Sequence, residues 1–563
     1  MSRHRLAAAE GAMRPRTVAL AAAAVAVAVG LALVPIGADV YEGGEAREGL
    51  VVREMLRTGD YILPLWNGSV VPSKPPLFHW LAAAGAALGG AGVTERTLRA
   101  PSIVLAGLVV LLVFLAGRAW GGEDVGFMAA LVLATTPQFL NEAGDGRVDM
   151  TLTAAITGAH LAFVHAMRGG GGRTHIVLAL CLALAMLAKG PVGPGLVGLT
   201  ALVFALTHRR LGAALRLVRP LPVLVFLAVA GGWYALAYHH RGMDFVAKQI
   251  VSENGEALLG GSRFPHRSPL YYVAPLVLAG LPWTLVLPWA VARGWRSGDL
   301  ARRHAVVWAA VVLIFFSLAP LKRAAYLLPL RPALALVIGW WLAEAAQEER
   351  PAGRPVIVAR ALALAAVAGG LLLAGATLAV HWGLVPGARL VAEGARREID
   401  VATYLRALAA AWVPLAALGF LVMLAAGLAA RALARARWRQ AALATAATVA
   451  GITVFVYGLF VPARAEQKSV KPFAHAVRDR LGAEDPLALL ASDEEIPFIF
   501  HAGRNIPVLA PVGTRPPEVP AGYYVLDQAR WREWNAPAGW EEVLASPHLF
   551  STHRHDLVLV RRR

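Results

Sequence analysis

The sequence predicts a polytopic α-helical membrane protein of about 13 spanning helices, followed by a small extracytoplasmic α/β domain. Hydrophobic residues make up 57% of the 563 positions and charged residues only 16%, whereas a soluble globular protein carries about 25% charged residues. Apolar runs of roughly 20 residues, long enough to cross a bilayer, recur along residues 1–462. Residues 463–563 instead combine short apolar runs with Gly- and Pro-rich turns, which is typical of a small α/β domain.

The chain is strongly basic, with 54 Lys and Arg residues against 36 Asp and Glu residues, a net charge of +18. In a membrane protein such an excess indicates cytoplasmic loops and contacts with anionic lipid headgroups, so no nucleic-acid partner is expected. Cys181 is the single cysteine and lies in an apolar run. A disulfide within the chain and a cysteine-based metal site are therefore both excluded.

Thirteen segments are long and apolar enough to be predicted as spanning helices. They are 17–36, 100–117, 125–140, 150–167, 175–190, 191–207, 219–238, 270–292, 304–320, 325–345, 359–384, 409–430 and 440–461. The first follows a basic N-terminal stretch and could be a signal peptide, but its apolar run is long and further membrane segments follow. We interpret it as an uncleaved anchor that enters the membrane from the cytoplasm.

A weaker apolar segment, 77–92, decides the topology of everything that follows it. If it lies on the outer face of the membrane, the arginine-rich loops between later helices all fall in the cytoplasm; if it spans, they all move outside, against the positive-inside rule. We therefore expect an amphipathic juxtamembrane segment within a long first external loop, 37–98. The prediction is a multi-pass protein of the cytoplasmic (inner) membrane with a cytoplasmic N-terminus and an extracytoplasmic C-terminal domain.

Short apolar runs in the C-terminal part predict three strands, at 487–491, 523–526 and 557–560, and a helix is predicted around 473–481. The first run is rich in Ala and Leu and has no β-branched residue, so it has the weakest strand signal of the three.

With this topology, ionisable residues gather at the external edge of the membrane, where their burial is costly and a functional role is the default hypothesis. Each of these residues could instead have a purely structural role. The first-loop glutamates could form ion pairs on a helix surface, Asp149 could be an N-cap, and Lys and Arg at helix ends could contact lipid. These roles do not explain why cations collect on the side that the insertion rule disfavours, together with carboxylates. As a set, they indicate a site for an anionic, lipid-linked substrate.

Several motifs follow one another in loops and at helix ends over about the first 330 residues. They are Glu45-Ala46-Arg47, Arg53-Glu54-Met55, Gly59-Asp60-Tyr61, Asn67-Gly68, Lys74-Pro75-Pro76-Leu77-Phe78-His79-Trp80, Gly146-Arg147-Val148-Asp149, Ala188-Lys189-Gly190-Pro191, His266 with Pro269-Leu270-Tyr271-Tyr272, Leu281-Pro282-Trp283, and Lys322-Arg323-Ala324-Ala325-Tyr326. This series resembles the GT-C superfamily of glycosyltransferases, in particular bacterial protein O-mannosyltransferases and the aminoarabinose transferases that modify lipid A. The resemblance implies a GT-C fold and transfer of a sugar from a polyprenyl-phosphate carrier to a lipid, glycan or protein acceptor on the outer face of the membrane.

The sequence departs from this family pattern at two positions. The family's first loop usually carries an Asp-Glu pair, with the Asp proposed as catalytic, and here the pair is Gly44-Glu45. The resemblance then leaves Glu45, or else Glu42 or Asp39, to supply the carboxylate. In the aminoarabinose transferases an acidic residue before the Lys-Pro step helps to hold a metal with a downstream histidine. This sequence has Ser73 there but retains His266, a candidate metal or acceptor contact, so both a divalent metal and no metal stay open.

The chemistry assigns roles to the remaining residue types. A phosphate leaving group requires preorganised cations, for which the candidates are Arg47, Lys74, Lys189, Lys322 and Arg323. An attacking hydroxyl requires a nearby base, for which the candidates are Glu45 and Asp149. Tyr326 is expected to line the lipid-phosphate site, and direct displacement predicts inversion at the anomeric carbon. The alternative is a flippase or transporter of a polyprenyl-linked sugar, although transporters place ionisable groups near the bilayer midplane and often have duplicated halves.

Overall fold

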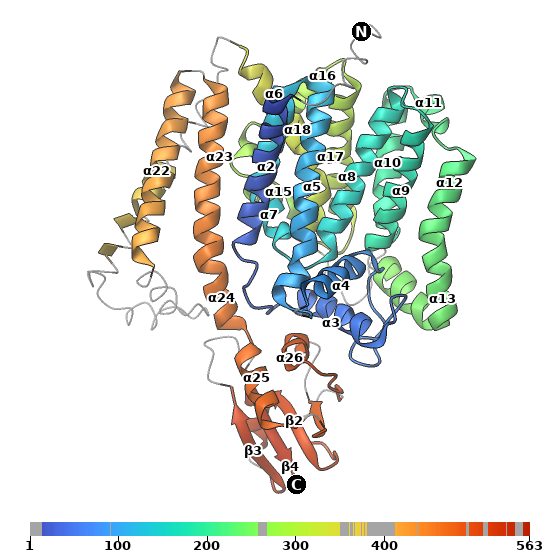
Figure 1. Ribbon diagram of the computed structural model, residues 1–563, viewed down its shortest axis with the longest axis vertical. Helices are drawn as coiled ribbons and strands as arrows, with labels where there is room; N and C mark the ends of the chain where they lie inside the picture. Colours follow the sequence, from blue (N-terminus) through green and yellow to red (C-terminus); the bar gives the residue numbers. More distant parts are fainter. Residues whose placement is uncertain are drawn as a thin grey trace.

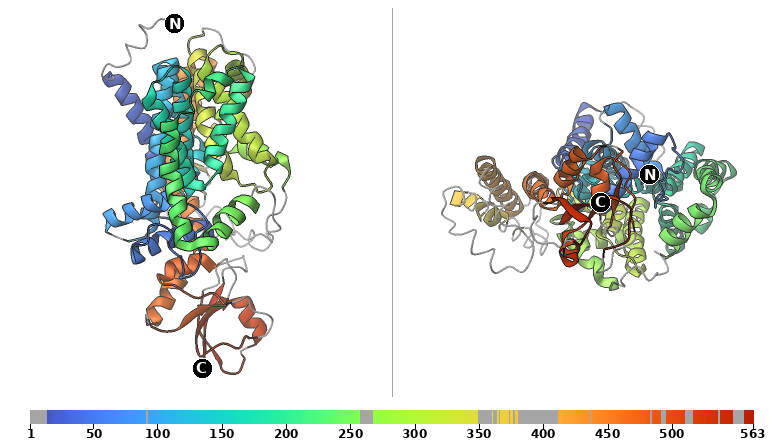
Figure 2. Two further views of the ribbon diagram at one scale, coloured as in Figure 1. Left: turned by 90° about the vertical axis from the view of Figure 1, so that its right-hand side faces the viewer. Right: turned by 90° about the horizontal axis from the view of Figure 1, so that it is seen from below.

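A helical bundle with a small sheet domain at one end is the architecture of the computed structural model (Figures 1 and 2). It describes residues 14–348 except 91 and 257–266, parts of 360–379, and 411–563 except 436, 483, 491–494, 510–515, 536 and 547–555. Within these residues, nine helices are long and apolar enough to cross a membrane. The predicted fold class is thereby confirmed.

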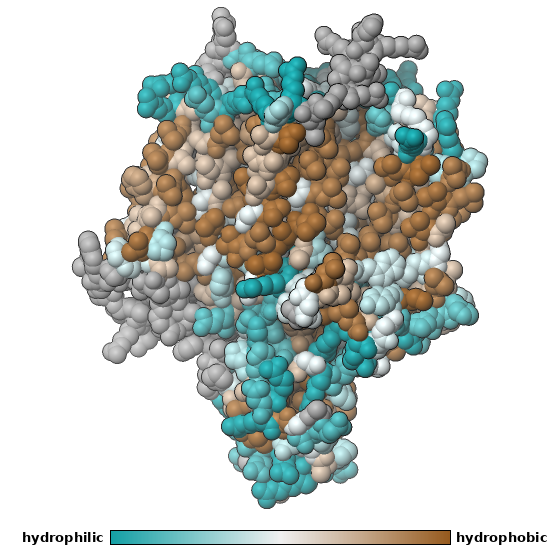
Figure 3. Space-filling view, in the orientation of Figure 1, coloured by the Kyte–Doolittle hydropathy of each residue, from teal (hydrophilic) through white to brown (hydrophobic). Residues whose placement is uncertain are grey.

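The nine long helical runs correspond to nine of the thirteen predicted spanning segments. They are α2 (Pro15–Leu33), α5 (Glu95–Gly121), α8 (Val148–Met167), α9 (Gly172–Lys189), α12–η1–α13–η2 (Pro220–Phe226, Leu227–Gly231, Gly232–Phe245 and Val246–Glu256), α17 (Leu300–Leu318), η5–α18 (Ala324–Leu330 and Arg331–Ala345), α22 (Trp412–Ala434) and α23–η6–α24 (Trp438–Phe455, Val456–Phe460 and Val461–Lys468). On the face shown in Figure 3, apolar side chains form a broad band across the bundle, with polar surface at both ends.

The other four predicted segments differ from single long helices. Segment 125–140 is split into α6 (Glu123–Ala134) and α7 (Pro137–Ala143), and α10 (Val192–Thr207) is short. Segment 270–292 is broken into η3 (Pro269–Tyr272), α15 (Val273–Leu278), η4 (Trp283–Leu285) and α16 (Leu287–Arg296). Elsewhere, the short helix α11 (Leu211–Leu215) follows α10. Prolines explain the breaks, because a proline inside a helix removes a backbone donor and clashes with the preceding turn. Segment 359–384 lies largely outside the described residues.

Segment 77–92 forms α4 (Leu77–Gly89), which lies beside α3 (Gly43–Thr58) at the end of the bundle and does not run through it (Figure 1). Its 13 residues rise about 20 Å, which is short of the ~30 Å hydrocarbon core of a bilayer. A left-handed Gly59 (φ 72°) ends α3, as is common at helix C-termini.

The C-terminal part contains a four-stranded sheet of order β1-β2-β4-β3. Strand β1 (Leu487–Leu489) is parallel to β2 (Gly522–Asp527), and β4 (Leu557–Arg562) is antiparallel to both β2 and β3 (Trp540–Ala545). Helices α25 (Lys471–Arg480), α26 (Ile496–Ala502) and α27 (Gln528–Trp534) pack around it. All three predicted strands are present, whereas β3 escaped prediction because this mostly exposed edge strand carries two adjacent glutamates.

This sheet domain is fastened to α3. Arg53 donates to the backbone carbonyls of Ile499 and Phe500 at 3.2 and 3.4 Å, and to that of Arg504 at 3.4 Å. The ring of Phe500 lies so close to Gly49 that a Cβ there would come within 2.5 Å of it. Apolar residues of α3 and α26 belong to one buried cluster, so the end of the chain braces the first loop.

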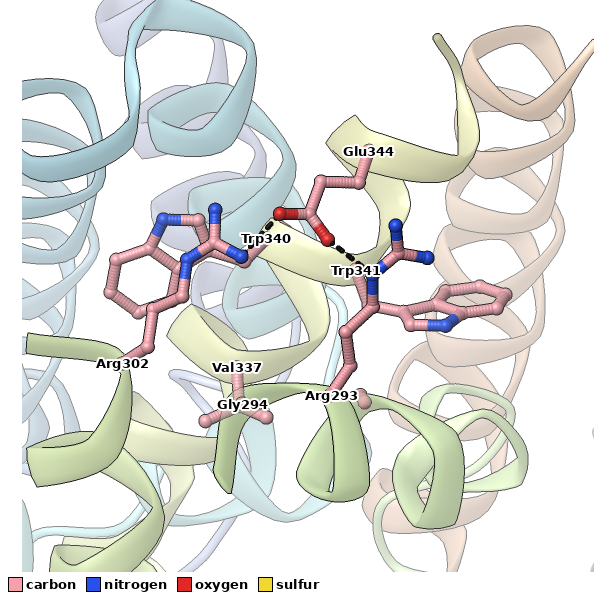
Figure 4. Close-up of a pocket in the computed structure, with 8 residues that line it drawn as sticks. Arg293, Gly294, Arg302, Val337, Trp340, Trp341 and Glu344 are labelled. Carbon is pink, nitrogen blue, oxygen red and sulfur yellow. Dashed lines mark hydrogen bonds and ion pairs between the residues drawn. The ribbon is translucent and has the colours of Figure 1, made fainter. Parts of the chain in front are cut away.

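The opposite end of the bundle, where α2 begins, is rich in arginine. Glu344 of α18 accepts a hydrogen bond from Arg302 of α17 and forms an ion pair with Arg293 of α16, whose Nε lies 2.8 Å from Oε2 (Figure 4). The guanidinium of Arg302 also lies over the ring of Trp340, 5.3 Å from its centre. Arginine therefore concentrates at the end of the bundle away from the sheet domain.

Candidate active site

Carboxylates and cations from five distant segments meet at the end of the bundle that faces the sheet domain (Figure 1). The segments are α3, the approach to α4, the turn between α7 and α8, the C-terminal end of α9, and the residues that lead into η5. Residues between Glu45 and Tyr326 are thus brought together at this end.

Asp149, in the first turn of α8, is the most completely enclosed carboxylate of the predicted site, with 4% of its surface exposed. Lys189, the last residue of α9, forms an ion pair with its Oδ1. The Lys189 ammonium also lies 4.6 Å from the centre of the Tyr326 ring, a cation–π arrangement. Arg323 is near enough for its charge to act on Asp149. The structure therefore brings together four residues that the sequence singled out.

Arg147 is a further cation that was not among the predicted phosphate ligands. It caps α8 in an extended conformation, and its Nε lies 3.8 Å from Oδ2 of Asp149 and 3.9 Å from Oδ2 of Asp145. Burial disfavours the charge, but the carboxylates of Asp149 and Asp145 raise the pKa of Arg147 above its ordinary value. The guanidinium is therefore firmly charged.

Glu45 faces a different partner. Arg99 of α5 donates to both of its oxygens, Nε to Oε1 at 2.7 Å and Nη2 to Oε2 at 2.8 Å, and the backbone N–H of Gly146 donates to Oε1 at 3.0 Å. Arg99 also donates to the carbonyls of Pro35 and Ile36 at 3.1 and 3.2 Å. The buried bidentate pair ties α3 to α5, the Gly146 hydrogen bond ties α3 to the turn before α8, and both Glu45 oxygens are occupied.

Glu48 and Lys74 extend the site along the first loop. Glu48 lies 2.6 Å from Nε2 of His79. Burial raises the pKa of a carboxyl, but the His79 hydrogen bond and the charges of Lys74 and Arg147 hold the pKa of Glu48 below its usual value. The charge of Glu48 in α3 thus interacts with that of Arg147 in the turn before α8.

Lys74 has a carboxylate partner that the sequence did not reveal. Its ammonium lies 2.6 Å from Oε2 of Glu253 in η2, and Lys248 lies 3.3 Å from Oε1 of the same carboxylate. The side-chain amide of Gln249 donates to the carbonyls of Pro72 and Lys74, at 3.0 and 3.1 Å. Helix η2 therefore fixes the segment that presents Lys74.

Three predicted ligands are not joined to this cluster. The Lys322 ammonium is buried and donates to the carbonyls of Ser317, at 2.8 Å, and Ala319, so it neutralises the C-terminal end of α17. Arg47 is half-exposed and forms no hydrogen bond or ion pair with the described part of the chain. His266 lies outside the described residues.

Two more carboxylates, Glu142 and Asp145, lie close by. Burial, reinforced by the charge of Asp149, raises the pKa of Glu142 to about 7. Burial and the charge of Glu45 raise the pKa of Asp145 well above its usual range. Glu142 forms no ion pair with any residue that the structure describes, so burial and the nearby carboxylate favour its protonated, neutral form.

A metal centre finds no ready ligand set in the described ranges, where no three His, Cys, Asp or Glu side chains are grouped as metal ligands. The position before Lys74 is Ser73, and the structure does not describe His266.

Comparison with known proteins shows which families and structures the chain resembles. Residues 73–233 match the family described as dolichyl-phosphate-mannose-protein mannosyltransferase. The chain is 28% identical to undecaprenyl phosphate-alpha-4-amino-4-deoxy-L-arabinose arabinosyl transferase 1 of Pseudomonas fluorescens over 52% of each chain. It is 29% identical to the enzyme of the same name from Sodalis glossinidius over 66% of each, and 30% identical to the Pseudomonas aeruginosa transferase over 52% of this chain and 54% of the relative. The matches thus span about half to two thirds of these relatives' length.

Solved structures resemble the chain over nearly its whole length. ArnT from Cupriavidus metallidurans bound to undecaprenyl phosphate superimposes with a TM-score of 0.75 at 19% identity, covering 97% of this chain and 98% of that one. Its apo state gives a TM-score of 0.74 at 19% identity, with coverages of 96% and 97%. The chain therefore has the fold of ArnT, and its sequence is similar to that of aminoarabinose transferases over about half to two thirds of its length.

Proposed function

We propose that the protein is a glycosyltransferase that moves a sugar from a polyprenyl-phosphate carrier to an acceptor lipid, glycan or protein. The observation that carries the proposal is the Asp149–Lys189 pair, enclosed at one end of the bundle with Arg147 and Arg323 beside it. A buried carboxylate next to several cations suits a reaction in which a hydroxyl attacks and a phosphate leaves. The names of the relatives, and the undecaprenyl phosphate bound to ArnT, support this carrier.

In the proposed reaction, the acceptor oxygen forms a bond to the anomeric carbon as the bond from that carbon to the phosphate oxygen breaks. The electron pair leaves with the phosphate, and Lys189, Arg323 and Lys74 stabilise the resulting charge. Asp149 accepts the acceptor's proton at Oδ2, because Lys189 pairs with Oδ1 and Nε of Arg147 lies 3.8 Å from Oδ2. A base of this kind contributes a factor of about 10²–10⁴ in rate. Displacement in line gives inversion.

Glu45 has a positioning role in this proposal. Because Arg99 and the N–H of Gly146 occupy both of its oxygens, it holds the first loop against the turn that presents Arg147 and Asp149. Asp149 is therefore our choice of base between the two carboxylates that the sequence offers.

For the donor sugar we propose a pentose that carries an amino group, such as 4-amino-4-deoxy-L-arabinose. The names of the relatives support this choice. Glu142 and Asp145 support it as well, because the ammonium group of such a sugar, bound beside these buried carboxyl groups, would favour their charged forms and form ion pairs with them.

For orientation we propose a protein of the inner membrane with a cytoplasmic N-terminus, a membrane domain at 1–462 and an extracytoplasmic domain at 463–563. The positive-inside rule supports this arrangement, because the arginine-rich end with Arg293 and Arg302 lies opposite the sheet domain.

The test is sugar transfer by purified protein in detergent, where there is no second compartment to transport into. Undecaprenyl phosphate carrying 4-amino-4-deoxy-L-arabinose is supplied with extracted envelope lipids, and release of undecaprenyl phosphate is measured. We expect turnover by the wild type and its near-complete loss in Asp149→Asn. Turnover with a mannosyl donor but not with the aminoarabinose donor would overturn the choice of sugar. No transfer in detergent, with movement of the donor across proteoliposomes, would favour the flippase.

A further inference from the structure

A cavity of about 450 Å³ lies between the paired helices α22 and α23 and the core of the bundle. The pair stands at one flank of the bundle in Figure 1. The lining of the cavity follows α23 from Trp438 to Tyr457, a stretch that rises about 28 Å, close to the ~30 Å thickness of the hydrocarbon core of a bilayer. The cavity therefore extends along the direction in which lipid chains lie.

The lining of this cavity is almost entirely apolar. Trp283 of η4 lies across from Ala429 of α22 and Ala442 of α23, and these short side chains leave the cavity wide. Among the lining hydroxyl groups, that of Thr448 already donates to the backbone carbonyl of Ala444 at 2.9 Å. A water molecule in a cavity needs two to four polar partners, so this lining suits a hydrocarbon chain better than water.

Two residues of the lining also reach the outer surface of the helices. Ile452 is 44% exposed and Val456 is 37% exposed, although both line the cavity. Apolar surface of a spanning helix faces lipid tails, so the cavity can be entered sideways from the bilayer. Leu443, on the same helix and 42% exposed, lies outside the lining.

Unpaired donors and positive charges gather at the end of the cavity where Leu433 and Trp438 lie. Arg360 donates from Nη2 to the carbonyl of Leu433 at 3.2 Å, whereas its Nε is buried without a partner among the described residues. The indole N–H of the buried Trp438 likewise has no acceptor there. Arg435 and Arg437, in the turn between α22 and α23, form no ion pair within the described ranges. An anionic headgroup supplies the acceptors and the charge that this end lacks.

We propose that the cavity binds an acyl chain of an anionic glycerophospholipid, whose phosphate and ester oxygens accept from Arg360, Arg437 and the indole of Trp438. The ring of Trp438 packs edge-on against that of Trp341, 5.1 Å between centres, and Trp341 belongs to the arginine-rich end (Figure 4). In the orientation proposed above, the headgroup is therefore in the cytoplasmic leaflet, at the opposite end of the bundle from Asp149. The bound chain fills the space between α23 and α18 and joins the α22–α23 pair to the core.

Two substitutions on α23 test whether the chain occupies this cavity. Ile452→Trp and Leu443→Trp add the same bulk at positions of nearly equal exposure, but only the first lines the cavity. Native mass spectrometry of the delipidated protein, titrated with phosphatidylglycerol, measures the dissociation constant of the first bound lipid. We expect at least about tenfold weaker binding in Ile452→Trp, because the ring displaces the chain, and a change below about threefold in Leu443→Trp.

A second set of variants tests the headgroup contacts. Arg360→Gln combined with Arg437→Gln removes two cations beside the cavity, whereas Arg210→Gln combined with Arg219→Gln removes two from turns before α11 and α12. We expect about tenfold or greater weakening for the first pair and less than about threefold for the second. The wild type should bind phosphatidylglycerol more tightly than the zwitterionic phosphatidylethanolamine.

Each part of the proposal has a result that would overturn it. Equal losses in Ile452→Trp and Leu443→Trp would show that the chain does not lie in the cavity. Equal losses in the two arginine pairs, or equal binding of the two lipids, would exclude the anionic headgroup site. Displacement of phosphatidylglycerol by an equimolar amount of undecaprenyl phosphate would assign the cavity to a prenyl chain instead. These measurements do not involve sugar transfer, so their failure leaves the proposed function intact.

Discussion

At the scale of single residues, the carboxylates of the site differ in what already occupies their oxygens. Glu45 is saturated by Arg99, whereas Asp149 keeps one oxygen open toward the cations. The sequence could not separate the two, because Arg99 lies 54 positions from Glu45 in a helix that otherwise looks apolar. The same limit hid Glu253, which lies 179 positions from Lys74. Residue types at a site can be predicted; partners brought together by folding cannot.

Glu45→Gln is expected to lower the free energy of unfolding strongly while affecting the catalytic rate less. Removing one partner of a buried ion pair leaves the Arg99 charge uncompensated, at a cost of about 3–5 kcal/mol. Thermal unfolding of purified protein checks this. The double variant Glu45→Gln with Arg99→Met should recover part of the loss, since the charge that was left unpaired is then gone. A double variant that is less stable than the single one would contradict the interpretation.

The raised pKa of Glu142 gives stability a pH dependence of defined sign. The folded state keeps its proton up to about pH 7, whereas the carboxyl has an ordinary value of 4.5 in the unfolded chain. The folded state thus binds more protons between these values, and stability falls as the pH rises through this window. In Glu142→Gln that part of the decline should disappear. Unfolding midpoints measured across the window, with the exposed Glu484→Gln as control, will show it.

At the scale of elements, the long helices could be predicted from apolar length alone, because the bilayer fixes how long a spanning helix must be. Interruptions within the membrane were harder to predict. Segment 270–292 is continuous in hydropathy but is broken into short helices: Pro275 and Pro288 lie in the first turns of α15 and α16, and Pro282 lies just before η4. Lys322 illustrates a second difficulty, because its ammonium donates hydrogen bonds to backbone carbonyls at the C-terminal end of α17. A basic motif predicts a cation at an edge but not the carbonyls that it will face.

The contact between α3 and α26 gives a prediction for Arg53. Arg53→Ala removes the donors to three backbone carbonyls, and hydrogen bonds from a charged donor contribute about 1.5–3 kcal/mol each. We expect faster proteolysis of the C-terminal domain and lower turnover, because α3 also carries Glu45 and Glu48. Arg478→Ala in α25 is the control, since its side chain is 53% exposed and its partner Asp479 is exposed as well. Equal behaviour of the two variants would contradict a bracing role.

At the scale of the whole molecule, the charge asymmetry between the two ends predicts which end faces the cytoplasm. In a Cys181→Ala background, Glu484→Cys lies in the sheet domain and Arg173→Cys at the start of α9, at the opposite end. A membrane-impermeant maleimide added to cells with a permeable outer envelope should label the first variant. The second should react only after the inner membrane is broken. The reverse pattern would invert the topology.

The bracing of α3 by the sheet domain has a consequence for biosynthesis. Arg53 and Ile499 are 446 positions apart. The contact that braces the first loop can therefore form only after almost the entire polypeptide has been translated. A nascent chain emerging from the ribosome can insert most of its helices yet still lack the brace that holds the candidate site. A product terminated ahead of the final strands would then remain in the bilayer as an inserted but inactive protein.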